Sequence, residues 1–201
     1  MKLHETFGDI DIYLFDQLLK GRIRTGDRIL DAGCGSGRNL IFLLRQGFDV
    51  SAADPNPYAV EDVRELAARL APSLDPGRFR QEPLEAMSFP DAAFSVVISS
   101  AVLHFANNDA HFEAMVRGLW RVLAGGGMLF TRLATTIGIA DRIRPLGDNR
   151  FALPDGSERY LASESALMHR TDALGGQLLE PLKTTLVQDQ RAMTTWIVRK
   201  A

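Results

Sequence analysis

The sequence predicts an α/β fold: a doubly wound, mostly parallel seven-stranded sheet with an antiparallel hairpin strand at its C-terminal end. Three observations predict it. Short apolar segments rich in β-branched residues alternate with amphipathic segments of helical period along the first two-thirds of the chain. A glycine-rich turn, DAGCGSG at 31–37, directly follows the first apolar strand-like segment. Near the C-terminus, two strand-like segments are joined by too few residues for a parallel crossover.

The N-terminal half alternates between predicted helices and predicted strands. The apolar spacing in DIDIYLFDQLLKGRI predicts a helix over about 9–21, ending at Gly21. Pro57 suits the first turn of a later helix, where a backbone N–H has no partner within the helix. In order, the predicted elements are that first helix, a strand at 28–30, a helix over 38–47, a strand at 48–54, a helix over 57–71 and a short strand at 78–81.

The second half begins with FSVVISS at 94–100, an apolar segment typical of a strand buried on both faces. We expect the next helix to be capped by Asp109 and to end at the glycines from Gly125. In PDGS the residue types are those of a turn, which indicates a small hairpin. The remaining predicted elements are a strand at 128–134, a helix over 162–176, and an antiparallel pair of strands within 178–189 and 193–200.

Length and composition bound the class of protein. The 201 residues match the length of one domain, so we expect residues 1–201 to form a single domain with an inserted, substrate-side segment at about 135–160. Lys and Arg number 23 against 25 Asp and Glu, a balance that argues against a nucleic-acid partner. One cysteine, no signal-peptide pattern and no long apolar segment predict a cytoplasmic protein without a membrane partner.

The glycine turn predicts a nucleotide-like cofactor. In a βαβ unit the first strand-to-helix turn lies at the edge of the sheet where ligands bind. Asp54 ends the second predicted strand, where a carboxylate can accept hydrogen bonds from ribose hydroxyls. A dinucleotide fingerprint would place its third glycine at position 38, which is Arg38 here. Asp31, just before the glycines, suits a cofactor with a positive ammonium better than a pyrophosphate.

The segments LDAGCGSG, AAD and FPDAAFSVVISSAVLHF together resemble the class I S-adenosylmethionine-dependent methyltransferase superfamily. The resemblance covers about residues 25–135, and the predicted C-terminal hairpin also fits that family's sheet. The segment GCGSGRNLIFLLRQGFDVSAAD is similar to small-molecule methyltransferases of the tellurite-resistance type. The resemblance implies a Rossmann-like methyltransferase fold, S-adenosylmethionine as cofactor, and methyl transfer to a small-molecule acceptor.

The resemblance also implies roles for the matching residues. Asp31 and the Gly33–Gly37 loop would hold the methionine part of the cofactor, and Asp54 would bind both ribose hydroxyls. Pro55 and Leu84 would enclose the adenine, and Ser99 would line the methyl-donor side. The full implied cofactor-binding set is Asp31, Gly33, Cys34, Gly35, Gly37, Asn39, Asp54, Pro55, Leu84, Glu85 and Ser99.

One position departs from the family pattern. Pro83 stands where the family often has an acidic residue that bonds the adenine amino group. Glu82 or Glu85 would have to replace that residue, and the sequence does not choose between them.

Catalysis requires little from the side chains, because the methyl donor is already activated and positioning supplies much of the rate. His104, after the fourth predicted strand, is the candidate general base; its alternative role is packing below the site. Tyr13 is the second catalytic candidate, although its spacing also fits the core. Arg132 is a candidate contact for an anionic acceptor, or a member of an ion pair. His4 and Phe7 would form a lid or a frayed end. The remaining histidines, His111 and His169, lie on helical segments and have the pattern of surface residues or of residues with satisfied hydrogen bonds.

Two other functional classes remain open from the sequence. A nicotinamide-dependent oxidoreductase also binds its cofactor at this edge of a parallel sheet, but it needs the glycine spacing that is missing here. A non-catalytic S-adenosylmethionine-binding regulator would keep the cofactor site without turnover. DPNPY resembles an element of nucleic-acid base methyltransferases, but it follows the second strand rather than the fourth, which argues against such a substrate. No spacing of His, Cys and Asp predicts a metal, and neither the acceptor atom nor the oligomeric state follows from the sequence.

Overall fold

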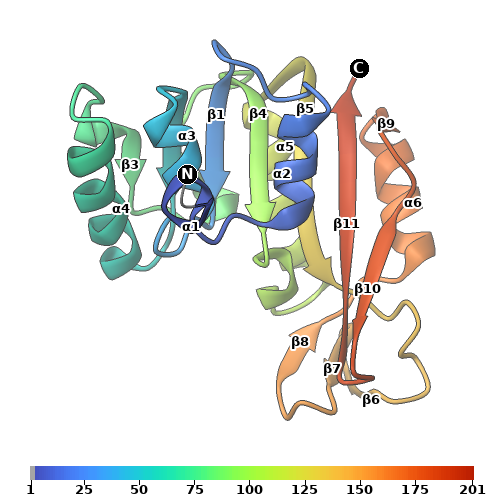
Figure 1. Ribbon diagram of the computed structural model, residues 1–201. Helices are drawn as coiled ribbons and strands as arrows, with labels where there is room; N and C mark the ends of the chain where they lie inside the picture. Colours follow the sequence, from blue (N-terminus) through green and yellow to red (C-terminus); the bar gives the residue numbers. More distant parts are fainter. Residues whose placement is uncertain (1–2) are drawn as a thin grey trace.

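The computed structural model describes residues 3–201 and contains a central sheet flanked by helices, with a small three-stranded sheet projecting from one end (Figure 1). In the central sheet the strand order is β10-β11-β5-β4-β1-β2-β3, and β9 pairs with β11. The strands from β5 to β3 run parallel, whereas β11 is antiparallel to both β5 and β10. The predicted doubly wound α/β class is therefore confirmed, with β9 as an eighth strand that the sequence did not predict.

The elements of the central sheet follow the predicted order closely. FSVVISS forms β4 at its predicted bounds, because an unbroken apolar and β-branched segment suits a strand buried on both faces. The strands are β1 (Arg28–Ala32), β2 (Asp49–Ala53), β3 (Phe79–Arg80), β4 (Phe94–Ser100), β5 (Leu123–Ala134), β9 (Gly176–Leu178), β10 (Lys183–Val187) and β11 (Arg191–Lys200). The helices are α1 (Leu3–Phe7), α2 (Ile12–Leu19), α3 (Leu40–Arg45), α4 (Pro57–Leu70), α5 (Asp109–Val122) and α6 (Glu164–Ala173), with single 3₁₀ turns η1 (Pro76–Arg78), η2 (Leu84–Ala86) and η3 (Leu103–Phe105).

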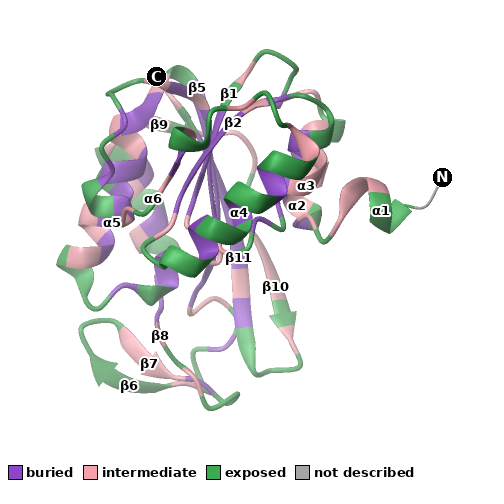
Figure 2. Ribbon diagram, turned by 90° about the vertical axis from the view of Figure 1, so that its left-hand side faces the viewer, coloured by how far each residue is buried: buried purple, intermediate pink, exposed green. Residues whose placement is uncertain are grey.

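The helices cover the two faces of the sheet and enclose two hydrophobic clusters. On one face, α5 and α6 pack over the side chains that include Leu30, Val97 and Trp196. On the other face, α2, α3 and α4 pack over the alternate residues, such as Ile29 and Ile98. Figure 2 shows the buried sheet between these two helical layers. Apolar burial on both faces is what holds the strand ends, and hence the ligand edge of the sheet, in place.

Helix α5 differs from its prediction at both ends. Asn108, not Asp109, is its N-cap, and the Asn108 side chain accepts the His111 N–H. Asp109 instead accepts hydrogen bonds from the Tyr160 hydroxyl (2.6 Å) and the Asn149 amide (2.8 Å). The glycines do not end the helix, which stops at Val122; they lie inside β5, where a Cβ at Gly127 would come within 2.8 Å of the Ser95 carbonyl oxygen.

The segment at 135–160 forms the small sheet, whose strands are β6 (Arg144–Gly147), β7 (Arg150–Ala152) and β8 (Glu158–Tyr160). PDGS lies in the loop between β7 and β8, so the predicted hairpin is confirmed. The small sheet is tied to the main body through Asp109, which bonds Tyr160 and Asn149. It projects beside the long ends of β10 and β11 (Figure 1).

The N-terminal helices lie on the α3 side of the sheet. Phe7 stacks on Phe42 of α3 at 5.1 Å between ring centroids and packs edge-on against Phe15. Helix α2 is capped by Asp11 and is shorter than predicted. For His4 and Phe7 the sequence left a lid or a frayed end open; the Phe7 ring is held in this aromatic cluster and His4 pairs with exposed Asp9. None of the helices within residues 3–201 combines the length and the apolar character that crossing a membrane requires.

Candidate functional site

A cavity of about 630 Å³ lies at the carboxyl ends of β1, β2 and β4. This is the point where neighbouring crossovers leave β1 and β4 in opposite directions, the usual ligand position in an open α/β sheet. Its volume falls in the range of small-molecule sites. Most of the predicted cofactor residues line it. The lining residues are Gly33, Cys34, Gly35, Ser36, Arg38, Asn39, Asp54, Pro55, Pro83, Leu84, Glu85, Ser100, Ala101, Val102, Phe105, Asn107, His111 and Met115.

The three glycines of the turn have different reasons to be glycine, although all have positive φ. A Cβ at Gly33 would overlap the Val102 side chain at 2.3 Å, so this position serves internal packing. A Cβ at Gly37 would press on Val63 and Leu66 of α4 at 3.0 Å. Gly35 is the exception, because its Cβ would meet nothing within 4 Å and the residue lines the cavity. Of the three glycines, Gly35 is the one whose missing Cβ would enter open space at the cavity, where a ligand can approach the backbone.

Asp54 follows β2 and faces the same cavity. Its Oδ2 accepts the Gly35 N–H at 2.9 Å and its Oδ1 accepts the Asn56 N–H at 2.9 Å. A carboxylate offers about four lone-pair positions, so each oxygen keeps capacity for one more donor. The carboxylate is therefore fixed in orientation and can still accept two hydroxyl groups.

The apolar end of the cavity contains Pro55 and Leu84, as predicted, on opposite chain segments. Glu82 is engaged elsewhere, since its carboxylate accepts the Ser88 N–H (2.8 Å) and the Ser88 hydroxyl. Glu85 lines the cavity instead, with Oε1 at 3.5 Å from Nε2 of His111. Of the two acidic candidates left open by the sequence, only Glu85 is placed to contact a ligand.

His111 was read from the sequence as a surface residue, but it lines the cavity. Its Nδ1 accepts the Asn107 N–H at 3.1 Å, so its Nε2 is directed toward Glu85. A signal was present in the sequence: His111 lies in the first turn of the helix after β4, at the ligand edge of the sheet. The Glu85–His111 pair is the polar group at this end of the cavity.

Asp31 lies at the end of β1 and is 1% exposed. Both of its carboxyl oxygens are buried and lack a hydrogen-bond partner within residues 3–201. Burial raises the pKa of Asp31 to about 7, against the opposing effect of the Arg38 charge, and the Asp54 charge adds to the rise. A buried carboxylate without a partner is costly, and a bound ammonium group would relieve that cost. Asp31 is not among the residues that line the cavity, but its unpartnered carboxyl group suits a cationic group bound close to the end of β1.

Residues 29–127 match the family described as a methyltransferase domain. The eEF1A lysine and N-terminal methyltransferase homolog of Drosophila melanogaster is 33% identical over 133 residues, which cover 63% of this chain and 19% of that protein. The ubiquinone biosynthesis O-methyltransferase of Methylocella silvestris is 37% identical over 105 residues, covering 52% of this chain and 39% of that protein. This chain thus spans well under half the length of both curated relatives. A solved S-adenosylmethionine-dependent methyltransferase from Methanosarcina mazei superposes with a TM-score of 0.69 at 19% identity, over 91% of this chain and 96% of that one.

Residues 29–127 of this chain form a methyltransferase domain, and the fold is that of S-adenosylmethionine-dependent methyltransferases. S-adenosylmethionine is the cofactor of such methyltransferases, and the cavity fits it through the open space at Gly35 and the spare acceptor capacity of Asp54. The match to a methyltransferase domain argues against the nicotinamide-dependent oxidoreductase. Similarity to the tellurite-resistance type stays a prediction.

The titration of Asp31 gives a testable pH dependence in this methyltransferase. Because the folded pKa lies above the unfolded one, the folded protein favours the neutral acid, and the free energy of unfolding falls as the pH rises toward 7. Asp31→Asn removes this penalty. We expect the melting temperature of the ligand-free variant, measured relative to that of the wild type, to increase between about pH 5 and about pH 8. A difference that stays constant over this range would contradict the assignment.

The segment before α2 is connected to the methyltransferase site through Asp11, which the sequence analysis missed. Asp11 is 3% exposed, its Oδ2 lies 3.3 Å from Arg132 and 3.6 Å from Arg38, and it accepts the Ser100 hydroxyl at 3.2 Å. Its backbone N–H donates to Oδ1 of Asn39 at 3.0 Å. The contact of Asp11 with two arginines explains why a buried carboxylate is tolerated here.

Ser99 does not line the cavity, contrary to the prediction; Ser100 does. Successive residues of a strand point to opposite faces, so a slip of one residue changes which face a side chain occupies. Ser99 pairs with Thr131 on β5 and is fully buried. Ser100 accepts a hydrogen bond from Arg38 at 3.2 Å at the cavity wall.

His104 does not reach the cofactor cavity and is unsuited to be a general base. Its Nδ1 accepts the Ala134 N–H at 3.2 Å, so the neutral ring carries its proton on Nε2 and can only donate there. Burial, helped by the charges of Arg159 and Arg191, lowers the pKa of His104 to about 4. The ring is a neutral hydrogen-bond donor at physiological pH and lines a second cavity of about 240 Å³.

Tyr13 also lies outside the cofactor cavity. Its hydroxyl bonds the Thr185 hydroxyl at 2.7 Å, and the Arg132 guanidinium sits 5.5 Å from its ring centroid. These contacts favour the packing role that the sequence left open. Cys34 lines the cofactor cavity but is 6% exposed, and burial raises the pKa of its thiol, which disfavours the reactive thiolate.

Proposed function

We propose that this methyltransferase transfers a methyl group from S-adenosylmethionine to a small-molecule acceptor. The observation that carries the proposal is the pairing of two cavities. The large one has the glycine turn and Asp54, and the small one adjoins it through a shared wall residue, Ala101. The first accommodates the methyl donor and the second an acceptor.

Different residues of the chain bind different parts of the cofactor. Asp54, held by Gly35 and Asn56, is the acceptor for the ribose hydroxyls. Pro55 and Leu84 form the apolar walls for the adenine, with Glu85 at its polar edge. Asp31, at the end of β1, would take up a negative charge when an ammonium group binds beside it. When bound, S-adenosylmethionine would supply an activated methyl group, with S-adenosylhomocysteine as the leaving group.

The contribution of the protein to catalysis is positioning and exclusion of water rather than proton transfer. Holding the acceptor in line with the breaking bond supplies several kcal/mol by proximity. Nδ1 of His104 accepts the Ala134 N–H and has no free lone pair for a proton, which supports a mechanism in which His104 is not the base.

Two observations support a small acceptor. The second cavity measures about 240 Å³ and is walled by Leu153, Asp155, Ser157 and Arg159 from the inserted segment, so it is covered by the chain itself. The name of the Methylocella silvestris relative places it in the biosynthesis of a small molecule, ubiquinone, whereas the name of the Drosophila relative gives a protein target, eEF1A. The net charge of −2 and the single, buried cysteine support a cytoplasmic protein without a nucleic-acid partner.

The proposal is tested by incubating the purified chain with methyl-labelled S-adenosylmethionine and panels of small thiols, amines, phenols and carboxylic acids. We expect label in at least one small product together with S-adenosylhomocysteine. Binding of S-adenosylhomocysteine without turnover on any panel, or with label only in added protein, would contradict the proposal. The first of these outcomes would favour the non-catalytic regulator.

A further inference from the structure

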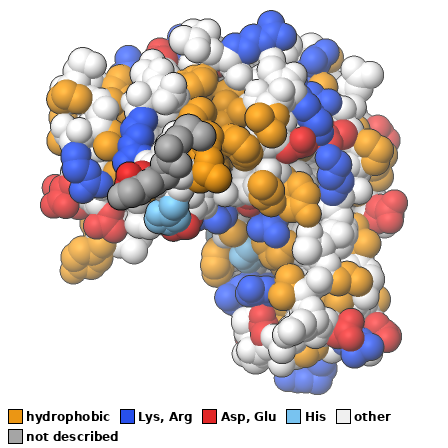
Figure 3. All heavy atoms as spheres, viewed as in Figure 1, with side chains coloured by type: hydrophobic (Ala, Val, Ile, Leu, Met, Phe, Trp, Pro, Cys, Tyr) orange, Lys and Arg blue, Asp and Glu red, His pale blue; other side chains and the backbone are white. Residues whose placement is uncertain are grey.

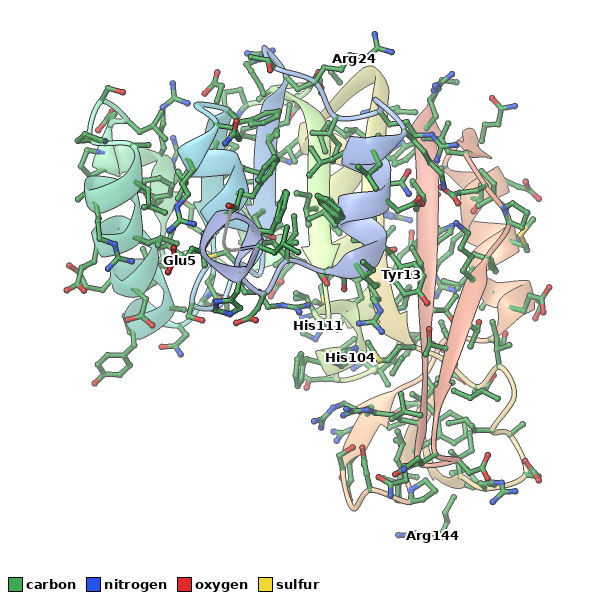
Figure 4. All side chains as sticks on the ribbon, in the orientation of Figure 1. Glu5, Tyr13, Arg24, His104, His111 and Arg144 are labelled. Atoms are coloured by element: carbon green, nitrogen blue, oxygen red, sulfur yellow. The ribbon has the colours of Figure 1, made fainter. Side chains whose placement is uncertain are left out.

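The second cavity is built at the junction of the main sheet and the small sheet, and its chemistry differs from that of the cofactor cavity. It is lined from β5, β11 and the β7–β8 hairpin. Figure 4 shows His104 in the angle between the two sheets, with His111 nearer the carboxyl ends of β1 and β4. Figure 3 shows Lys or Arg side chains together with a histidine in the same angle. The lining residues are Ala101, His104, Arg132, Ala134, Leu153, Asp155, Ser157, Arg159, Val187, Arg191 and Met193.

The register of the sheet explains why two of the arginines share this cavity. Ala134 pairs with Met193 across β5 and β11, and alternate residues of a strand point to one face. Arg132, two residues before Ala134, and Arg191, two residues before Met193, therefore lie on that same face. The β7–β8 hairpin adds Arg159 from the opposite side.

The negative groups near these arginines do not balance them. Asp155 is the acidic residue of the cavity wall; its Oδ1 accepts the Ser157 N–H and hydroxyl, and its Oδ2 lies 3.8 Å from Arg191. Asp11 contacts Arg132 at 3.3 Å, but Asp11 is also shared with Arg38. Arg159 has no acidic partner among the ion pairs of the described residues: it donates to a backbone carbonyl and lies 4.9 Å from the Phe105 ring centroid. The cavity thus has an excess of positive charge.

Hydrogen-bond donors also predominate among the polar groups of the wall. The Arg132 side chain is 21% exposed, and its Nε is buried without a partner in the described part of the chain. His104 has its proton on Nε2, as derived above. Guanidinium groups and an imidazole N–H together match a carboxylate, which accepts bidentate and charge-assisted hydrogen bonds.

We propose that the second cavity binds the carboxylate group of the methyl acceptor, so that the enzyme acts on small carboxylic acids. The inference rests on the proposed function, because it takes the second cavity as the acceptor site. The arginines anchor the acid, and the acceptor atom faces Ala101, the wall shared by the two cavities. Ala101 has φ of 65°, a conformation unusual for alanine, which is typical of residues held in place at functional sites.

Calorimetric titration in the presence of saturating S-adenosylhomocysteine tests this assignment. The probes are small aromatic and aliphatic carboxylic acids, each compared with its own carboxamide. We expect at least one acid to bind about tenfold more tightly than its amide, the scale of one charge-assisted pair. Arg159→Gln and Arg191→Gln should each weaken binding of the acid by a similar factor. Neither variant should change binding of the amide.

Two further variants sharpen the test. Arg142→Gln is the matched control, because Arg142 pairs with exposed Asp189 and does not line the cavity; it should bind the acid as the wild type does. Asp155→Asn keeps an oxygen for the Ser157 donors and removes the negative charge, so it should bind the acid more tightly. Failure of every acid to bind at millimolar concentration, equal binding of acid and amide, or unchanged acid affinity in both arginine variants would overturn the proposal. In those cases S-adenosylhomocysteine binding would still stand; loss of that binding in the wild type would instead overturn the proposed function.

Discussion

Replacing Gly35 by valine should abolish cofactor binding while leaving the protein folded. Gly35 has φ of 51° and its missing Cβ would project into the open space of the cofactor cavity. A valine side chain would fill the volume that the methionine part of the cofactor needs. Overlap in a packed site costs up to ~3 kcal/mol, so calorimetry should show S-adenosylhomocysteine binding weakened by about a hundredfold or more.

Valine at positive φ also strains the backbone, by about 1–2 kcal/mol, and a control must separate the two effects. Gly47→Val is that control, since Gly47 has φ of 71°, its Cβ would meet nothing within 4 Å, and it does not line the cavity. We expect both variants to lose similar thermal stability and only Gly35→Val to lose binding. Equal cofactor affinity in the two variants would show that no ligand approaches Gly35.

Replacing Asp54 by alanine should weaken S-adenosylhomocysteine binding about tenfold or more, the scale of one lost hydrogen bond to a charged group. The ribose hydroxyls would lose their acceptor, and the Gly35 N–H would lose the partner that orients the turn. Isothermal titration calorimetry measures the change directly. The wild-type dissociation constant in this variant would contradict the ribose assignment.

Asp75→Ala provides the matched control for Asp54→Ala. Asp75 accepts the N–H of the residue two positions on, Gly77, as Asp54 accepts that of Asn56, but Asp75 lies outside the cofactor cavity. Both variants lose a local cap of the same kind. Only the loss of Asp54 should therefore change the affinity for the cofactor.

The sequence predicted the fold and most of the residues that line the large cavity, because both depend on local patterns. The alternation of apolar strands and amphipathic helices is repeated at each element, and FSVVISS became β4 without a change of bounds. Asp54 and the glycines lie at strand ends that pair side by side, β1 with β2. Strand order then brings Leu84 to the same cavity through a short loop.

Residues that depend on distant contacts were not predicted. Asp11 contacts Arg38 and Arg132 only because the start of α2 packs where these two side chains converge, and nothing in its local sequence shows this. The tautomer of His104 is set by the N–H of Ala134, which is 30 residues away. The prediction of Ser99 rather than Ser100 at the cavity was wrong for a different reason. An error of one residue along a strand places the side chain on the opposite face of the sheet.

The most direct test of the central claim is a crystal structure of the chain soaked with S-adenosylhomocysteine. The account predicts the ribose hydroxyls on the Asp54 carboxylate, the adenine between Pro55 and Leu84, and the amino-acid part over Gly35. Electron density for the compound at another place, or in this cavity without contact to Asp54, would contradict it.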